Sequence, residues 1–272
     1  DNEIRIIADV DGDCFEERIP EVPFYGTSRS DPTGIYSIRG NGGGSITENE
    51  IGMISDDSTD SNYPNGIAYD SSDEVWYFAE KSGILKTLNE GGSLGEKVYG
   101  SIADGADIAG AAFFDDTYYF IPNGGDTLQS VDIKGDANYG SANAPDGSAP
   151  SPTDVASLNW TLIGLGDLAV DRTTEILYVS TTRTDESGMN FFSVDLNDTT
   201  TQIEIASESD GDRTEFAISS QIAFDQDMRL WAHNAGNGEW RIADTSDGSL
   251  GGVVATTREY TDLAQSGANS IE

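Results

Sequence analysis

The sequence predicts an all-β fold and, within that class, a five-bladed β-propeller made of four-stranded antiparallel blades. Three observations predict it. Short apolar segments alternate with turn residues along most of the 272 residues. The same arrangement of segments returns at intervals close to the ~40–50 residues of a propeller blade. The 31 Gly and 8 Pro residues favour many turns over long helices.

The clearest repeat unit lies at residues 66–90, GIAYDSSDEVWYFAEKSGILKTLNE. Its apolar segments have the length of strands and are bounded by polar turn residues such as Asp70–Asp73. The segments are rich in Val, Ile, Tyr, Phe and Trp, as is typical of strands. We expect the four strands of this unit at Ile67–Tyr69, Val75–Phe78, Ile84–Leu88 and Lys97–Ile102.

The chain before this unit is less regular. Residues 1–21 fit no blade, and the segment that follows repeats the pattern without an obvious first strand. Its expected strands are Pro23–Ser28, Gly34–Arg39 and Ile51–Ser55. A blade that lacks one strand must obtain it from another part of the chain to complete the ring.

Three more units follow the clearest one. The third is expected at Gly110–Asp116, Thr117–Ile121, Thr127–Ile133 and Leu158–Ile163. Before its last strand, residues 135–156 are rich in Gly, Ala, Ser, Pro and Asp, which predicts a flexible insertion. The fourth and fifth units are expected at Asp167–Asp171, Ile176–Ser180, Asn190–Asp195, Gln202–Ala206, and then Gln221–Asp225, Arg229–His233, Glu239–Ala243 and Gly252–Thr256.

The spacing of the first strands indicates how the ring closes. Intervals of 45, 56, 54 and 49 residues separate the apolar anchors Ile67, Ala112, Leu168, Ile222 and Ile271. The last anchor belongs to Asn269–Glu272, which is similar in sequence to Asn65–Ala68. We therefore expect this C-terminal strand to complete the N-terminal blade, within one domain over residues 1–272. Six blades are the alternative, if residues 1–21 hold part of another blade.

The repeated sequence pattern resembles YWTD, NHL and SMP-30-type propeller repeats. The matching segments are Gly66–Asp70 with Val75–Phe78, and Gln221–Asp225 with Leu230–Trp231. The resemblance covers roughly residues 22–272 and implies architecture, because propellers of this kind have very different functions. Those families usually have six blades, so no functional residue is carried over from them.

Charge argues against several classes of partner. The chain carries 49 acidic and 14 basic residues, a formal net charge of −35. Such a surface repels phosphate backbones and anionic membranes, and no apolar run approaches the ~18 residues of a membrane helix. We therefore expect no nucleic-acid binding and no membrane insertion. Salt relieves the self-repulsion of so acidic a surface, which suits seawater, brine or a Ca²⁺-rich exterior.

Two features found in hydrolase active sites are present, and each has a structural explanation. Gly91–Gly95 matches the GxSxG nucleophile elbow, which requires a strand before Ser93 and a helix after it. Here it links two expected strands, and the near-copy Gly248–Gly251 lies at the equivalent point of the fifth unit, so both are predicted to be turns. His233 is the only histidine, which excludes a zinc site built on several histidines. It is predicted to be solvated or hydrogen-bonded near a loop.

An aspartate ends the first strand of four units: Asp70, Asp115, Asp171 and Asp225. These carboxylates could form a ring that binds a cation or acts as acid and base. A residue that recurs in every blade is more often structural, and Asp commonly accepts hydrogen bonds from the backbone of a following tight turn. We expect the structural role.

The best candidate for a metal site is the acidic N-terminal loop. Oxygen ligands on alternate residues of a loop suit Ca²⁺. The candidate ligands are Asp9, Asp11, Asp13, Glu16 and Glu17. The spacing departs from the EF-hand pattern, since Cys14 occupies the sixth position of the loop, where the EF-hand has Gly. Cys14 is the single cysteine, so an intrachain disulfide is excluded.

The expected function is that of a non-enzymatic module, extracellular or on a cell or virion surface, which binds other proteins or copies of itself in an ordered assembly. One alternative is a Ca²⁺-dependent lactonase, another hydrolase or a glycoside hydrolase that uses carboxylates converging on the central channel. Another alternative is a lectin that stacks glycans on exposed aromatic side chains. The four Trp residues fall inside expected strands, which favours packing between blades over glycan binding: Trp76, Trp160, Trp231 and Trp240.

Overall fold

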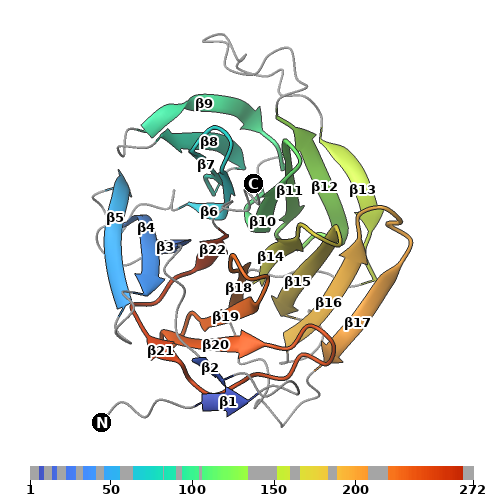
Figure 1. Cartoon of the computed structure of the whole chain (residues 1–272). Helices are drawn as coiled ribbons and strands as arrows, with labels where there is room; N and C mark the ends of the chain where they lie inside the picture. Colours follow the sequence, from blue (N-terminus) through green and yellow to red (C-terminus); the bar gives the residue numbers. More distant parts are fainter. Residues whose placement is uncertain are drawn as a thin grey trace.

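The computed structural model describes residues 6–8, 14–16, 23–28, 33–40, 46–55, 64–81, 83–89, 94–103, 106–133, 152–159, 166–182, 189–207 and 220–265. Every regular element among these residues is a β-strand. Five sheets have four antiparallel strands each, and they stand around a common axis in Figure 1. The chain is a five-bladed β-propeller.

Four blades are continuous in sequence, and in each the first strand lies nearest the axis. The first of them comprises β6 (Asn65–Asp70), β7 (Val75–Ala79), β8 (Ile84–Asn89) and β9 (Leu94–Ser101). The next comprises β10 (Ile108–Phe114), β11 (Thr117–Pro122), β12 (Thr127–Asp132) and β13 (Thr153–Ser157). The other two comprise β14 (Gly166–Asp171), β15 (Ile176–Thr182), β16 (Met189–Asp195), β17 (Gln202–Ser207), and then β18 (Ser220–Phe224), β19 (Leu230–Asn234), β20 (Glu239–Ala243) and β21 (Ala255–Thr256).

The fifth blade joins the two ends of the chain, as the sequence predicts. Its strand order is β22-β3-β4-β5, and β22 is the strand next to the axis. The bounds are β22 (Asp262–Ala264), β3 (Phe24–Ser28), β4 (Thr33–Gly40) and β5 (Ile46–Ser55). A separate hairpin precedes them, β1 (Ile6–Ala8) with β2 (Cys14–Glu16).

Two strand positions differ from the sequence prediction. The closing strand is Asp262–Ala264, and the predicted closing residues around Ile271 lie outside the described residues. Leu263 takes the anchor position because its side chain is fully buried between blades. The fourth strand of the β10–β13 blade is Thr153–Ser157, where we had expected Leu158–Ile163, so the strand begins inside the predicted insertion.

The core consists of five apolar clusters, each packed between adjacent blades. Aromatic rings contribute to each seam. Tyr77 stacks on Phe113 across one of them with ring centroids 5.4 Å apart, and Phe24 stacks on Trp240 at 5.4 Å across another. Gly110 lies where β10 and β14 approach most closely, because a Cβ there would meet the Asp167 Cα at 2.7 Å. The blades are thus in tight contact around the axis.

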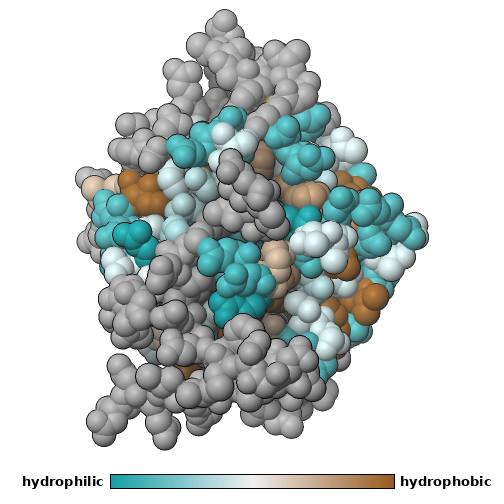
Figure 2. Space-filling view, viewed as in Figure 1, coloured by the Kyte–Doolittle hydropathy of each residue, from teal (hydrophilic) through white to brown (hydrophobic). Residues whose placement is uncertain are grey.

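The surface is mostly polar. Figure 2 shows hydrophilic and intermediate side chains over most of the described part of this face, with hydrophobic ones in small separate patches. Among the described residues, the exposed large hydrophobic side chains lie apart in sequence: Met53, Ile203 and Val253. Among the described residues, no helix has the length and apolar character needed to cross a membrane.

Candidate functional site

A belt of polar side chains surrounds the axis at the beginning of the inner strands, and we call it the girdle: Asn65, Asp107, Asp167, Gln221 and Asp262. Each inner strand turns an unpaired edge of backbone toward the axis. On this edge, one N–H group of every inner strand donates to an aspartate of the girdle, and the donors are Ile67, Ile108, Leu168, Ile222 and Leu263. The girdle thus supplies acceptors that the blades themselves lack.

Asp167 is the main acceptor of the girdle. Its Oδ1 accepts the N–H of Leu168 at 2.8 Å on its own strand. Its Oδ2 accepts the N–H of Ile222 on β18 at 3.0 Å and the N–H of Leu263 on β22 at 3.2 Å. One carboxyl group therefore holds three inner strands together, although it has no exposure to solvent.

Asp262 binds the next blade of the ring and also contacts Asp167. Its Oδ2 accepts the N–H of Ile67 on β6 at 2.6 Å, and its side chain has no exposure to solvent. The two carboxyl groups are neighbours, because Asp167 accepts the N–H of Leu263, the residue that follows Asp262. Two ionised carboxylates repel each other in a buried site, so this arrangement favours protonation of one of them.

The environment favours that protonated state. Burial raises the pKa of Asp167 well above its usual value, and the charge and hydrogen bond of Asp262 raise it further. The N–H groups of Ile222 and Leu168 oppose the rise in this pKa, because they stabilise the ionised form. The pair thus titrates as a unit that retains one proton above the usual carboxyl range.

The other members of the girdle connect neighbouring blades or remain partly unsatisfied. The Asn65 side chain donates to the backbone carbonyl of Ile108 on β10 and to Asp107 Oδ1 at 3.4 Å. Tyr118 donates its hydroxyl to the carbonyl of Gly66 at 2.5 Å. Gln221 is 1% exposed, and its Oε1 has no hydrogen-bond partner among the described residues. The girdle is a filled, structural arrangement.

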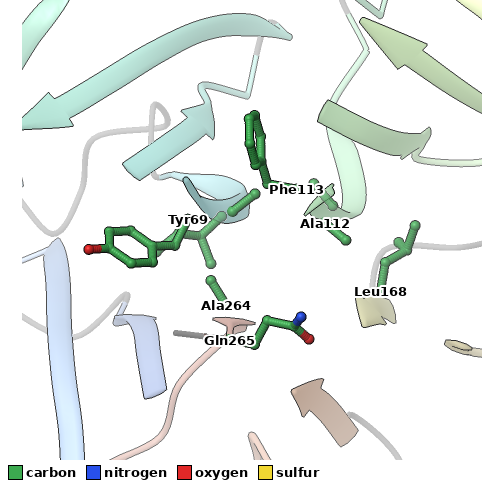
Figure 3. Close-up of a pocket in the computed structure, with 9 residues that line it drawn as sticks. Tyr69, Ala112, Phe113, Leu168, Ala264 and Gln265 are labelled. Carbon is green, nitrogen blue, oxygen red and sulfur yellow. The ribbon is translucent and has the colours of Figure 1, made fainter. Parts of the chain in front are cut away.

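A small pocket lies on the axis beyond the girdle (Figure 3). Its walls are mainly apolar and include Ala112, Phe113 and Leu168, with Tyr69 and Gln265 as polar contributors. The Gln265 Nε2 donates to the carbonyl of Val170 at 3.1 Å, which holds this side chain at the wall. The space admits on the order of a single water molecule.

The aspartates at the other end of the inner strands, the turn end, mostly stabilise their own turns, as the sequence predicts. Asp70 Oδ1 accepts the N–H and the hydroxyl of Ser72, and Asp171 Oδ1 accepts N–H groups of the two threonines that follow. Asp225 accepts two turn N–H groups and also the Arg229 and Trp231 side chains. Asp115 has a positive φ and forms part of a two-residue turn. No three of the described carboxylates at this end form a group that could hold a metal ion.

His233 is buried in β19, whereas we had expected it near a loop. Its Nε2 accepts the N–H of Tyr260 at 2.9 Å, so the ring is neutral with its proton on Nδ1. Burial lowers the pKa of His233 to about 3. Its ring also packs on Trp240, with centroids 4.6 Å apart. The position and the contacts fit a structural residue that supports the segment before β22.

The structure describes some of the other candidate residues that the sequence analysis named. Gly248 has a φ of 75° and Ser249 lies in the turn after β20, so this copy of the GxSxG pattern is a turn, while Ser93 lies outside the described residues. Trp76, Trp231 and Trp240 are buried between blades, and Trp160 is not described. Burial between blades disfavours these three tryptophans as exposed glycan platforms.

The proposed Ca²⁺ loop lies almost entirely outside the described residues. Asp9, Asp11, Asp13 and Glu17 are not described, and Glu16 is placed only as the last residue of β2. The β1–β2 hairpin brings the two ends of this loop together, since Ala8 pairs with Cys14. Within the described part of the chain, no cluster of three or more His, Cys, Asp or Glu residues could hold a metal ion.

Comparison with known proteins supports the fold. A chain in a crystal structure of a nidogen/laminin complex aligns with a TM-score of 0.57 over 89% of this chain and 97% of its own length, at 11% identity. A gluconolactonase from Xanthomonas campestris aligns with a TM-score of 0.55 over 96% and 87%, at 14% identity. No family model and no curated protein matches the sequence. The architectural resemblance inferred from the repeats is therefore confirmed.

Proposed function

We propose that this propeller is a non-enzymatic module that binds other proteins in an extracellular or particle-surface assembly, such as an appendage, a cell coat or a virion. The observation that carries the proposal is the small free volume that the described residues leave at the axial pocket. A small-molecule site needs a volume of about 300–1,000 Å³, whereas the axial pocket admits on the order of one water molecule. The carboxyl groups of Asp167 and Asp262 accept backbone N–H groups of the inner strands.

Charge indicates what kind of partner fits. A net charge of −35 favours partners with basic surfaces, or contacts between copies that are bridged by cations. Ca²⁺ bound by the loop at Asp9, Asp11 and Asp13 would serve the second arrangement. One of the similar structures is part of a protein–protein complex, which is consistent with a binding role for this shape.

Imaging of the native context tests the proposal directly. The full chain is located in its source by antibody labelling and electron tomography, with and without a Ca²⁺ chelator. We expect the propeller at an outer surface, in contacts that repeat from copy to copy. A dispersed location inside the cell, with no repeating contact, would contradict the proposal.

The second candidate is a lactonase at the axial pocket, and the likeness to a gluconolactonase favours it. The purified chain is tested on gluconolactone and on a panel of lactones and glycosides, with Ca²⁺ present. We expect no hydrolysis above the spontaneous rate, and turnover above about 1 s⁻¹ would overturn the binding proposal. If turnover occurs, a Gln265→Ala variant locates it at the pocket, with Asp126→Asn on an exposed loop as the control.

A further inference from the structure

The closing strand β22 is short, and side-chain hydrogen bonds help to hold it in the ring. It has three residues, and it pairs with β3 on one side only. On its other side, two bonds from the girdle hold it: the Leu263 N–H donates to Asp167, and Asp262 accepts the N–H of Ile67. These bonds connect β22 with β14 and β6, which are not its partners in the sheet.

We propose that the Asp167–Asp262 pair is a proton-operated latch, in which one shared proton keeps β22 in the ring and loss of that proton loosens it. Both carboxyl groups are fully buried, and Asp167 binds the N–H of the residue next to Asp262. A proton on one carboxyl allows it to donate to the other, whereas two ionised carboxylates have no proton to share. Without that proton, two negative charges would lie near each other in a fully buried site. Separation of the two side chains relieves that repulsion, and because Asp262 belongs to β22, separation means displacement of this strand.

The titratable groups around the latch do not compensate for the lost proton. Asp107, directly before β10, is another acid, and Tyr118 on β11 has a pKa raised well above its usual value by burial and by Asp262. His233 on β19 binds the backbone N–H of Tyr260, two residues before β22, and burial keeps it neutral. None of these groups can therefore supply a positive charge to balance the second carboxylate when the pair loses its proton.

The direction of the pH effect follows from proton release. In the open state each carboxyl group has an ordinary pKa of about 3.9, whereas the closed pair holds its proton to higher pH. Between these two values, opening releases one proton, so the open fraction rises about tenfold for each pH unit. Opening that exposes His233 takes up a proton below about pH 6.5 and acts in the opposite direction. A comparison with a matched variant is therefore needed to isolate the pair.

Asp262→Asn is that variant. The amide of the new side chain can donate to the Asp167 carboxylate, and its oxygen can still accept the Ile67 N–H, so the latch no longer needs a proton. Hydrogen exchange of the Leu263 amide, expressed relative to its intrinsic rate, reports opening directly because this N–H donates to Asp167. It is measured from pH 4.5 to 9 in wild type, in Asp262→Asn and in the exposed control Asp126→Asn.

We expect the ratio of protection in Asp262→Asn to protection in wild type to rise about tenfold per pH unit above pH 4.5, and to level off where the closed pair ionises. The control should follow the wild type. A ratio that stays constant with pH would overturn the proposal. If Asp262→Asn does not fold, Asp167→Asn replaces it, because its amide can donate to Asp262 in the same way.

A measurement on the wild type alone gives a second test. A protonated carboxyl group has an infrared C=O band that ionised carboxylates lack. We expect this band at neutral pH, its loss at higher pH together with the loss of Leu263 protection, and its absence from Asp262→Asn. Absence of the band from folded wild type at pH 7 would show that no shared proton operates the latch.

Discussion

Strand β14 carries two aspartates, Asp167 at the girdle and Asp171 at the turn to β15. Asp171 accepts backbone N–H groups two and three residues along the chain and is partly exposed. Asp167 accepts N–H groups from residues 55 and 96 positions away and has no exposure. The same residue type therefore stabilises a single blade at one end of the strand and the whole ring at the other.

The two ends of the inner strands also differ in how far their hydrogen bonds reach along the chain. Burial raises the pKa of the girdle carboxyl Asp167, and burial also lowers the pKa of the His233 imidazole in the neighbouring strand β19. Asp70 and Asp171 at the turn end bind N–H and hydroxyl groups of residues two and three positions further along the chain. We infer that the girdle determines whether the ring is closed, and that the turn end adjusts each blade independently.

Replacing the two aspartates of β14 one at a time gives the largest expected effect. Asp167→Ala leaves three N–H donors without their carboxyl acceptor in a buried site, at a cost of about 1–2 kcal/mol each, so we expect the free energy of unfolding to fall by about 3–6 kcal/mol. Asp171→Ala removes a solvent-accessible turn cap and should cost about 0.5–1 kcal/mol. Denaturant unfolding followed by tryptophan fluorescence measures both.

A similar loss in the two variants would contradict the division between the ends of the strand. Asp225 provides an intermediate case, because it lies at the turn end but is 6% exposed and also accepts the Trp231 Nε1 at 2.8 Å. Its replacement by Ala should fall between the other two in cost. The stability cost of each substitution would then follow the burial of the carboxyl group and the number of hydrogen bonds it accepts, and not its position along the chain.

The blades could be predicted from sequence because their signals are local. Apolar segments such as Val75–Phe78, bounded by turn residues, reproduce the observed strand β7 to within one residue. The aspartate caps could be predicted for the same reason, since Asp70 and Asp171 bond to residues that directly follow them. Periodicity and turn chemistry are properties of short stretches, and they need no knowledge of the ring.

The girdle could not be predicted in the same way. Asp262 bonds to a residue 195 positions away, and a polar residue before an apolar anchor is a common beginning for a strand. One signal was present: Asp262–Ala264 repeats the sequence Asp-Leu-Ala of residues 167–169. That match would have placed the closing strand correctly, whereas the similarity of Asn269–Glu272 to the start of β6 placed it too far along the chain.

The pH dependence of stability due to His233 gives a further test of how burial near the girdle affects titratable side chains. Its pKa in the folded chain, about 3, is lower than its ordinary value of about 6.5, so the unfolded chain binds the proton more tightly. Stability that depends on neutral His233 is thus present above pH 6.5 and is lost as the pH falls toward 3. Between pH 6.5 and pH 5 this amounts to about 2 kcal/mol.

His233→Gln isolates this contribution, because a Gln side chain can accept the Tyr260 N–H and does not titrate. The difference in the free energy of unfolding between wild type and His233→Gln should shift by about 2 kcal/mol against the wild type on going from pH 6.5 to 5. The carboxylates common to both chains cancel in this difference. A difference that does not change with pH would show that His233 is not kept neutral by its buried site.

The smallest expected effect comes from a turn-end substitution, which tests whether this end of the strands is independent of the girdle. Asp115 and Asp116 join β10 to β11 in a two-residue turn with φ values of 47° and 60°, a conformation for which Asn-Gly is the preferred sequence. Asp116→Gly should stabilise the chain by about 0.5–1 kcal/mol, because glycine adopts a positive φ without steric cost. The backbone carbonyl that accepts the Ile133 N–H is retained in the variant.

Because this turn lies at the far end of β10 from the girdle, hydrogen exchange of the Leu263 amide in the variant should match the wild type at every pH. A changed Leu263 protection would show that the two ends are coupled.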